Sequence, residues 1–199
     1  MPSNKKAILL SGGMDSIALA YWKRPNIAIT IDYGQKAAEA EIKAATSVAK
    51  ALNIEHHIIQ IDCSSLGSGS LSDNAPLPQA PSPEWWPYRN QLLVTIAAME
   101  AIKLGVEEIM LGTVKTDETH KDGTMEFYKQ LNALMSYQEG NIKITVPAIN
   151  MSTEELVKAS HIPTRQLLWA HSCNTSNEPC GRCRGCMKYR EVKASLRIP

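Results

Sequence analysis

The sequence lacks the features that mark membrane and secreted proteins. No uninterrupted apolar run approaches the roughly 18 residues of a membrane-spanning helix, and no charged-then-apolar leader opens the chain. The formal net charge is only +1, so there is no global basic field that would attract nucleic acid. We therefore expect a cytoplasmic protein whose partners are small or locally recognised, with no membrane and no general affinity for nucleic acid.

Cysteine is scarce outside one short segment. Four of the five cysteines lie between Cys173 and Cys186, and Cys63 stands alone. In a cytosolic protein such close spacing favours a metal site over disulfides. We expect Cys63 to be only a small apolar residue.

A Walker A phosphate-binding loop is also missing, because no G-x-x-x-x-G-K-[ST] pattern occurs. Instead, the stretch SGGMDS at 11–16 joins an apolar run at 7–10 to a helix-like stretch at 14–22. Its two glycines permit a tight turn, while its two serines and the free amides of a new helix suit a phosphate. The alternative is an ordinary strand-to-helix turn capped by Asp15 or Ser16. We expect Asp15 on a solvent-facing loop.

Five strand-like runs alternate with helix-patterned segments along the chain. The runs cover residues 7–10, 27–31, 57–61, 108–111 and 142–146. This alternation predicts an α/β fold with a Rossmann-like, parallel five-stranded sheet and helices on both faces. A length of 199 residues fits one such domain, which we assign to 1–171, followed by a small C-terminal segment at 172–199.

Polar or glycine residues follow three of these runs. SGGMDS follows the first, DYGQ at 32–35 the second, and Gly112 with Asp117 the fourth. Ligands of parallel sheets bind at the carboxyl ends of the strands, so we expect these residues on one rim. Taken singly, Asp32 is also compatible with a helix N-cap, Gly112 with a turn and Asp117 with a solvated loop carboxylate.

A long aperiodic stretch covers residues 62–87 and contains five prolines from Pro76 to Pro87. A loop of this length inside a compact domain is either functional or disordered. Trp85 and Trp86 close it, and the adjacent Arg89 and Asn90 suit a planar or anionic ligand. The alternative is that the tryptophans only fill a gap in the core.

Three further segments are predicted to be structural helices. Residues 36–52 carry alanine, valine and leucine at helical spacing, and residues 123–137 carry apolar side chains on one face. Ser152 followed three residues later by Glu155 has the form of a capping box. We assign no chemistry to these helices.

Cys173, Cys180, Cys183 and Cys186 follow the pattern C-x6-C-x2-C-x2-C. Four thiolates at this spacing can close a tetrahedron about one ion, which favours structural Zn²⁺, although an iron–sulfur cluster uses the same ligands. Basic residues flank the cysteines, namely Arg182, Arg184, Lys188 and Arg190. They are compatible with a nucleic-acid contact, with mere solubility, or with the phosphate tail of a ligand in the active site.

These pieces together resemble one family. SGGMDS resembles the pyrophosphatase loop of the N-type ATP pyrophosphatases, whose fold is adenine nucleotide alpha hydrolase-like. Nearly the whole chain resembles the 7-cyano-7-deazaguanine synthases of the queuosine and archaeosine pathways. The matching pieces are SGGMDS at 11–16, DYGQ at 32–35, the serine-leucine pair at 70–71, PYRN at 87–90, the glycine-to-aspartate spacing at 112–117 and the cysteine segment at 172–186.

The resemblance implies a homodimeric ATP-dependent ligase that uses Mg²⁺. Such an enzyme adenylates the carboxylate of 7-carboxy-7-deazaguanine and reacts it with ammonia to give the nitrile, 7-cyano-7-deazaguanine. The implied nucleotide-binding residues are Leu10, Ser11, Gly12, Gly13, Asp15, Ser16, Asp32, Tyr33, Gln35 and Gly112. The implied catalytic residues are Asp15, Ser16 and Asp117, and the implied substrate-binding residues are Trp86, Tyr88, Arg89, Asn90 and Asp117.

Three positions depart from the family pattern. The substrate segment after Asp117 reads Glu118 to Gly123 in place of the family's Pro-Asp-Cys-Arg run, Thr153 stands where the family has a lysine, and His171 stands where it has a tryptophan. Some relatives in antiviral systems are thought to attach a deazapurine to a protein amine, which is one alternative for this chain. A zinc-knuckle RNA-binding protein with a vestigial nucleotide loop is another.

Overall fold

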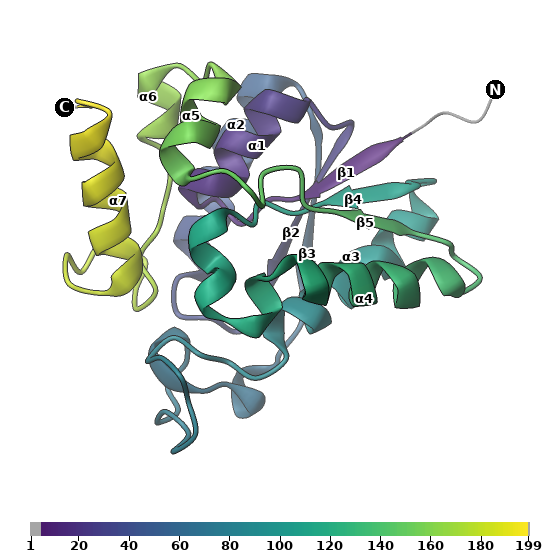
Figure 1. The fold of residues 1–199 in the computed structure, drawn as a ribbon, viewed down its shortest axis with the longest axis horizontal. Helices are drawn as coiled ribbons and strands as arrows, with labels where there is room; N and C mark the ends of the chain where they lie inside the picture. The colour runs from purple at the N-terminus through teal and green to yellow at the C-terminus, as the bar shows by residue number, and fades with distance from the viewer. Residues whose placement is uncertain (1–4, 199) are drawn as a thin grey trace.

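The computed structural model describes residues 5–198, which form a three-layer α/β structure (Figure 1). A single five-stranded sheet runs in the order β3-β2-β1-β4-β5, and every pairing between neighbours is parallel. Its strands are β1 (Lys6–Leu9), β2 (Ile27–Asp32), β3 (Glu55–Gln60), β4 (Glu108–Met110) and β5 (Lys143–Thr145). The predicted fold class is confirmed.

Helices cover both faces of this sheet (Figure 1). The α-helices are α1 (Met14–Lys23), α2 (Ala38–Leu52), α3 (Arg89–Lys103), α4 (Met125–Tyr137), α5 (Thr153–Ser160), α6 (Thr164–Leu167) and α7 (Arg184–Ser195). Within residues 5–198, four short 3-10 helices lie in the loops, namely η1 (Ser64–Leu66), η2 (Gly69–Leu71), η3 (Lys115–Thr119) and η4 (Lys121–Gly123). Helices α1, α2 and α5 lie on one face, and α3 and α4 lie on the other.

Two apolar cores result, because successive side chains of a strand point to opposite faces. Ala7 of β1 and Ile29 of β2 join the core under α3 and α4, whereas Ile8 and Ala28 join the core under α1, α2 and α5. All four side chains are fully buried. The central strands are therefore apolar on both faces, as the continuous apolar runs predicted.

The strand order places a topological switch point between β1 and β4. The chain leaves β1 toward β2 on one side, and it returns after β3 to pair β4 with the other side of β1. In open α/β sheets this is where ligands bind, outside the carboxyl ends of the strands. SGGMDS and Gly112 follow the two strands that flank it.

Several predicted boundaries shift by a few residues. The first predicted strand runs from 6 to 9 instead of 7 to 10, and the third from 55 to 60 instead of 57 to 61. Residues 121–123 form η4, so the helix predicted from residue 123 begins at Met125. The capping box is confirmed, since the Glu155 amide donates to Ser152 Oγ (3.2 Å) and the Ser152 amide donates to Glu155 Oε2 (2.8 Å).

The C-terminal segment packs against the sheet domain. Its helix α7 lies beside α5, and Val192 of α7 joins the core under α1 and α5 (Figure 1). The His171 amide donates to the carbonyl of Gly12 at 2.9 Å, just before the segment begins. The segment is therefore part of the surroundings of the SGGMDS loop.

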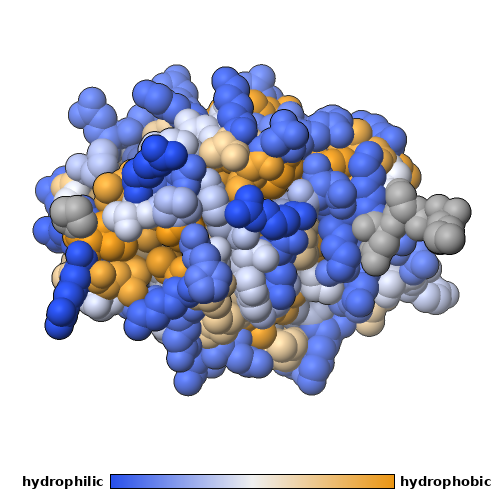
Figure 2. Space-filling model, turned by 90° about the horizontal axis from the view of Figure 1, so that it is seen from above, coloured by the Kyte–Doolittle hydropathy of each residue, from blue (hydrophilic) through white to orange (hydrophobic). Residues whose placement is uncertain are grey.

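Most of the surface seen from above in Figure 2 is polar, with apolar patches at the left and along the upper middle of the view. Leu168 and Trp169, which follow α6, are among the exposed large apolar side chains. Among residues 5–198, no helix combines the length and the hydrophobicity that crossing a bilayer would require.

Candidate active site

A cavity of about 850 Å³ opens at the carboxyl ends of the strands. A volume of this size is typical of small-molecule sites. Its walls come from the ends of β1, β2 and β4, from the loop at 62–87, from η3 and η4, and from α7. The long loop is thus an ordered wall of the cavity.

The SGGMDS loop forms the floor of this cavity at the switch point. Gly12 has a φ of 77°, and a Cβ there would lie 2.4 Å from the carbonyl oxygen of Glu41. Only glycine fits, because the backbone is left-handed and because the loop runs directly against α2. The tight turn that the two glycines predicted is therefore required by the packing of α2.

The amino end of α1 faces the cavity without a side-chain cap. Gly13 occupies the N-cap position, so the first amides of α1 have no hydroxyl or carboxylate from the cap residue to accept them. Ser16 Oγ donates to the carbonyl of Gly13 at 2.9 Å and lies 3.1 Å from Ser11 Oγ. The alternative of a turn capped by Asp15 or Ser16 is wrong, and the uncapped amides have the geometry that suits an anion.

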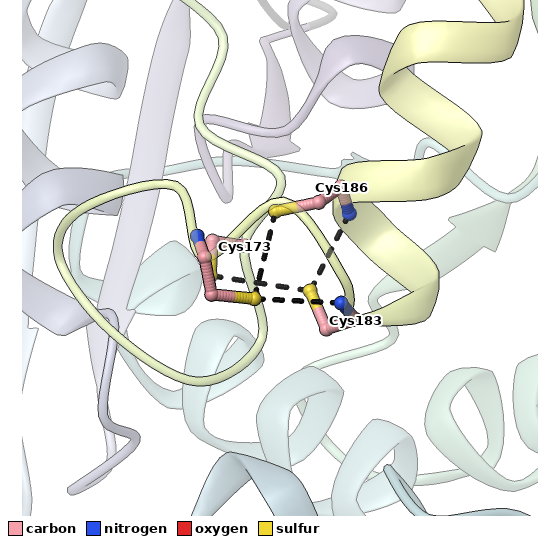
Figure 3. Close-up of side chains that lie close together, drawn as sticks. Cys173, Cys183 and Cys186 are labelled. Atoms are coloured by element: carbon pink, nitrogen blue, oxygen red, sulfur yellow. Dashed lines mark hydrogen bonds between the residues drawn. The ribbon is translucent and has the colours of Figure 1, made fainter.

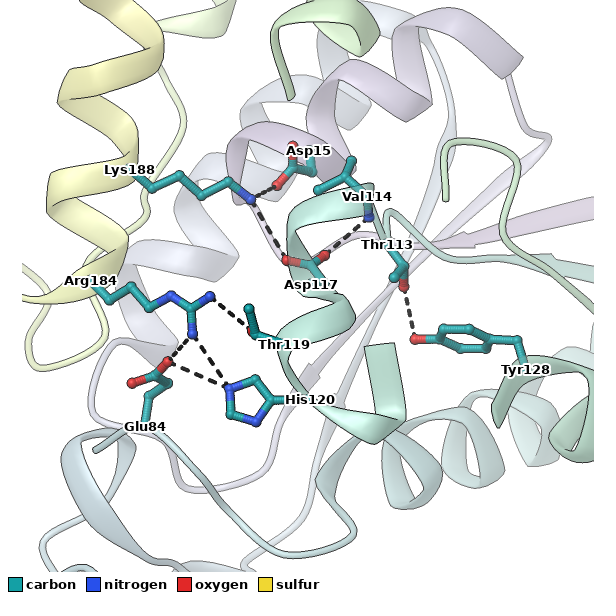
Figure 4. A network of polar contacts seen from close by, with 10 residues as sticks. All are labelled: Asp15, Glu84, Thr113, Val114, Asp117, Thr119, His120, Tyr128, Arg184 and Lys188. Atoms are coloured by element: carbon teal, nitrogen blue, oxygen red, sulfur yellow. Dashed lines mark hydrogen bonds and ion pairs between the residues drawn. The ribbon is translucent and has the colours of Figure 1, made fainter. Parts of the chain in front are cut away.

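Asp15 is not on a solvent-facing loop, which corrects the sequence-based expectation. It is the second residue of α1, and only 20% of its side chain is exposed. Lys188 Nζ of α7 lies 2.9 Å from its Oδ2, whereas its Oδ1 is buried without a hydrogen-bond partner (Figure 4). Burial raises the pKa of Asp15 above its usual value, although Lys188 opposes this.

A second buried oxygen beside Asp15 is also without a partner. This atom is Oγ1 of Thr153, the first residue of α5, and it has no partner within ordinary hydrogen-bond distance, although Thr153 interacts with the Asp15 carboxyl and lowers its pKa. Buried polar atoms are nearly always paired in native proteins. The two side chains interact with each other, and a ligand or ion bound in the cavity would give each of these two oxygens a closer partner.

Gly112 and Asp117 form the opposite side of the floor. A Cβ on Gly112 would lie 2.9 Å from Ser16 Cα, so β4 can approach α1 only through glycine. Asp117 Oδ2 accepts a hydrogen bond from the Val114 amide at 3.0 Å, and its Oδ1 lies 3.7 Å from Lys188 Nζ (Figure 4). One lysine therefore faces the two aspartates that the sequence proposed for catalysis.

The end of β2 forms an aromatic and charged wall. Tyr33 and Trp86 pack edge to face with ring centroids 5.1 Å apart, and both are buried. Arg89 and Glu41 line the cavity beside them. Gln35 donates to Glu41 Oε2 at 2.8 Å, but burial dominates and raises the pKa of Glu41 to about 7. This wall suits a planar, polar ring.

The segment that departs from the family pattern also lines the cavity. His120 Nε2 lies 3.4 Å from Arg184 of α7, which donates to Glu84 Oε1 at 2.8 Å and to Thr119 Oγ1 at 3.1 Å (Figure 4). Burial acts to raise the pKa of Glu84, but the hydrogen bond from Arg184 lowers it below its usual value. This network joins the long loop, η3 and α7 across one end of the cavity.

Most of the proposed site residues meet at the cavity. Those that line it are Leu10, Ser11, Gly13, Asp15, Ser16, Tyr33, Trp86, Arg89, Asn90, Gly112 and Asp117. The others lie outside its walls: Gly12 and Gln35 support the turn and the end of β2, Asp32 accepts from the Gly34 amide at 3.1 Å, and Tyr88 is 81% exposed.

Sequence reasoning left several cavity residues unassigned. The sequence assigns no chemistry to the helix that carries Glu41, and three roles are open for Lys188 and Arg184 in the basic flank. The structure directs these two side chains from α7 into the cavity (Figure 4). In the sequence, the position of Lys188 and Arg184 just after the cysteines is the one feature that points to a role in the site. It indicates a cavity-lining position only when the packing of α7 is known.

The four cysteines of the C-terminal segment converge on one point (Figure 3). Their sulfur atoms all lie within 4.8 Å of one another, and the Cys180–Cys186 and Cys173–Cys183 sulfurs are 4.0 and 3.9 Å apart. Backbone amides donate to three of the sulfurs at 3.3–3.4 Å. Burial acts to raise the pKa of the Cys173 thiol, but the hydrogen bonds to its sulfur have the larger combined effect and lower the pKa to about 5.

These distances fit a single tetrahedral ion. Sulfurs bound at about 2.3 Å to one zinc would stand about 3.8 Å apart. A cluster of several irons lies between its ligands and would hold the sulfurs further apart. The cysteines therefore fit a mononuclear metal site, and the amides that donate to the sulfurs favour the thiolate form.

Comparison with known proteins gives relatives along almost the whole chain. The 7-cyano-7-deazaguanine synthase of Methanobrevibacter smithii is 31% identical over 210 residues, which cover 94% of this chain and 92% of the relative. That of Desulforudis audaxviator is 31% identical over 221 residues, which cover 96% of this chain and 97% of the relative.

A solved structure is similar in fold. It is the U34-tRNA thiolase NcsA from Methanococcus maripaludis with its [4Fe-4S] cluster, which matches with a TM-score of 0.54 and 17% identity over 97% of this chain and 65% of the thiolase. The present chain thus spans about two thirds of that protein, and the likeness concerns the fold alone. Residues 5–194 match the family described as Queuosine biosynthesis protein QueC. The chain belongs to the QueC family and is an enzyme of that family.

Proposed function

We propose that this enzyme uses ATP to adenylate the carboxylate of 7-carboxy-7-deazaguanine and then reacts the adenylate with ammonia to form 7-cyano-7-deazaguanine. The observation that carries the proposal is the uncapped amino end of α1, which opens into the cavity through a glycine turn at the switch point. Such an end binds phosphate through free amides and the positive end of the helix dipole. Relatives that bear the synthase name support the choice of substrate.

The chemistry needs a leaving group on the carboxylate. A carboxylate oxygen attacks the α-phosphorus, the bond to the bridging oxygen breaks, and pyrophosphate leaves with that electron pair. Ammonia then attacks the acyl carbon, a proton is lost and AMP departs, which gives the primary amide. The amide oxygen attacks the α-phosphorus of a second ATP in the same way, pyrophosphate leaves, and loss of AMP with two protons gives the nitrile. The α1 amides and the Ser11 hydroxyl would hold phosphate oxygens as negative charge moves onto them.

Mg²⁺ fits the acidic side of the floor. Asp15 offers a buried oxygen without a partner, and Asp117 Oδ1 faces the same lysine, so the two carboxylates can hold the ion directly or through water. When bound there, Mg²⁺ would neutralise charge on the phosphates. The four cysteines would hold Zn²⁺ in a separate, purely structural role.

The aromatic wall at the end of β2 is our candidate for a heterocycle. Tyr33 and Trp86 offer ring edges and faces, Glu41 offers a carboxyl that can accept N–H groups, and Arg89 offers donors. The floor and this wall belong to the same cavity. A ring bound at the wall can therefore place a carboxylate near the phosphates.

A pyrophosphate-release assay tests the proposal. Purified protein with ATP, Mg²⁺, ammonia and 7-carboxy-7-deazaguanine should release pyrophosphate, and mass spectrometry should detect the adenylate and the nitrile. Omission of ammonia should leave the adenylate without nitrile. Absence of turnover with this acid, while ATP binds, would contradict the proposed substrate.

A second candidate function is transfer of a deazapurine acyl group to a protein amine. It is favoured by the altered segment, because His120 and Asp122 line the cavity where the family carries a different run. Turnover with an amine-bearing protein in place of ammonia would support it. An RNA-binding function has less support, because Lys188 and Arg184 point into the cavity and leave a smaller basic surface.

A further inference from the structure

Lys188 occupies an unusual position for a residue of the C-terminal helix. Its Nζ lies 2.9 Å from Asp15 Oδ2 and 3.7 Å from Asp117 Oδ1, and it lines the cavity beside the SGGMDS loop (Figure 4). Only 32% of its side chain is exposed. The Lys188 side chain therefore extends from α7 to the amino end of α1.

This position coincides with the place where the proposed reaction builds negative charge. The amides of α1 and the Lys188 ammonium converge on the same floor, and Thr153 and Asp15 present orphaned oxygens next to it. Among cavity-lining lysines and arginines of residues 5–198, Lys188 alone makes an ion pair with Asp15 or Asp117. Arg184 is engaged by Glu84, and Arg89 lies on the aromatic wall.

We propose that Lys188 is the cation that binds the phosphates of ATP and stabilises the departing pyrophosphate. This inference rests on the proposed function. In the absence of nucleotide the ammonium neutralises two carboxylates. With a metal–nucleotide complex in the cavity, Asp15 and Asp117 would hold the metal, and the Lys188 ammonium would donate hydrogen bonds to phosphate oxygens without any transfer of a proton.

The position of Lys188 also gives the cysteine segment a role in the active site. Lys188 follows Cys186 by two residues on α7, and the amino end of α7 is held by the cysteines, since the Cys186 amide donates to Cys183 Sγ at 3.4 Å. A metal bound by the four thiolates would therefore fix the helix that carries the lysine. The cysteine segment therefore holds α7 in place and also supplies the Lys188 side chain to the reaction.

Lys188→Met tests this role because methionine keeps the length of the side chain and removes its charge. Arg182→Gln is the matched control, since Arg182 is exposed on the cysteine segment and does not line the cavity. Both variants should keep the metal content and melting temperature of the wild type. Lys188→Gln replaces Lys188→Met if the latter loses its metal.

Two titrations without chemistry separate a direct role from a structural one. With Mg²⁺ and an ATP analogue that carries a methylene between the α- and β-phosphates, Lys188→Met should raise the dissociation constant by about tenfold. With Mn²⁺ alone, followed by electron paramagnetic resonance, the same variant should bind several-fold more tightly, because the lysine no longer competes for Asp15 and Asp117. A merely distorted pocket would weaken both.

Exchange of labelled pyrophosphate into ATP measures the adenylation step. At saturating ATP and acid, Lys188→Met should lose about 10²-fold in rate, on the scale of a lost electrostatic group, while Lys188→Arg should recover part of it. Wild-type exchange rates in Lys188→Met, or unchanged affinity in both titrations, would overturn the inference.

If wild type binds nucleotide but shows no exchange with the deazaguanine acid, the proposed substrate is wrong, and the two titrations still decide the role of Lys188. If wild type binds no nucleotide, both fail.

Discussion

At the scale of single residues, Asp15 shows how function and stability oppose each other. Burial raises its pKa, so the native state binds a proton more readily than the unfolded chain does, and ionisation at neutral pH costs stability. Such strain at a site is expected where a ligand completes the structure. The orphaned Oδ1 of Asp15 is the atom that a ligand would satisfy.

We predict that Asp15→Asn lowers activity without lowering stability. The variant should fold and keep its metal, and its melting temperature at pH 8 should equal or exceed that of the wild type, because a buried charge has been removed. Pyrophosphate release should fall by about 10²-fold or more. Calorimetry and the release assay check this, and a variant with full turnover would remove Asp15 from the mechanism.

Glu41 predicts a dependence of stability on pH. Burial raises its pKa from 4.5 to about 7, so the native state holds a proton that the unfolded state has lost between these values. The stability contributed by the neutral carboxyl is therefore present below pH 4.5 and lost as the pH rises to 7, by about 3 kcal/mol at most. Glu41→Gln lacks this loss.

Urea unfolding of wild type and Glu41→Gln at pH 5 and pH 8 measures the effect. The difference in unfolding free energy should move in favour of the glutamine variant at pH 8. A difference that stays constant across this range would mean that Glu41 is ionised in the native state at both pH values.

At the scale of elements, the capping box of α5 positions a cavity residue. Ser152 and Glu155 satisfy each other's amides, and Thr153, next in the chain, faces Asp15. We predict that Ser152→Ala lowers the unfolding free energy by about 1 kcal/mol, as loss of an N-cap hydroxyl does elsewhere. Glycine at this position should cost less, and equal losses for alanine and glycine would argue that the hydroxyl is not the cause.

The cysteine loop and α7 form a second such element. We predict that Cys183→Ser lowers metal content and melting temperature, because a three-thiolate site binds zinc less tightly and the Cys183 sulfur also accepts the Cys186 amide. Nucleotide affinity should fall as well, since Lys188 depends on the placement of α7. Metal analysis, calorimetry and analogue titration check this, and a variant that keeps its metal would rule out the four-cysteine site.

At the scale of the whole molecule, one cavity joins segments that are far apart in the chain. Lys188 and Asp15 are separated by 173 positions, and Arg184 and Glu84 by 100. These two ion pairs connect α7 to α1 and to the long loop (Figure 4). Folding of the C-terminal segment and assembly of the active site are therefore expected to be coupled.

Removal of the metal should reveal this coupling. After treatment with a strong chelator, the sheet domain should stay folded by far-ultraviolet circular dichroism, while nucleotide affinity falls at least as far as in Lys188→Met. Addition of Zn²⁺ should restore both affinity and melting temperature. Full nucleotide affinity in metal-free protein would show that α7 holds its place without the cysteines.

Much of the fold was predictable because its signals are local. Buried strands of a parallel sheet are continuous apolar runs, so Ile27–Asp32 and its neighbours were recognised within a few residues. The boundaries failed where the local backbone conformation decided them, as at 121–123, where the 3-10 helix η4 delays the start of α4 to Met125. Periodicity does not reveal the conformation of one residue.

The sequence by itself determined the parallel sheet, the glycine turn after the first strand and the cluster of four cysteines, because each depends on residue types at fixed short spacings. Only the tertiary structure decided that Asp15 is buried, that Glu41 faces the cavity, and that Lys188 and Arg184 reach into it rather than into solvent. These outcomes depend on how α2, α5 and α7 pack around the strand ends. Burial and charge pairing between distant segments are properties of that packing, and no short pattern in the chain encodes them.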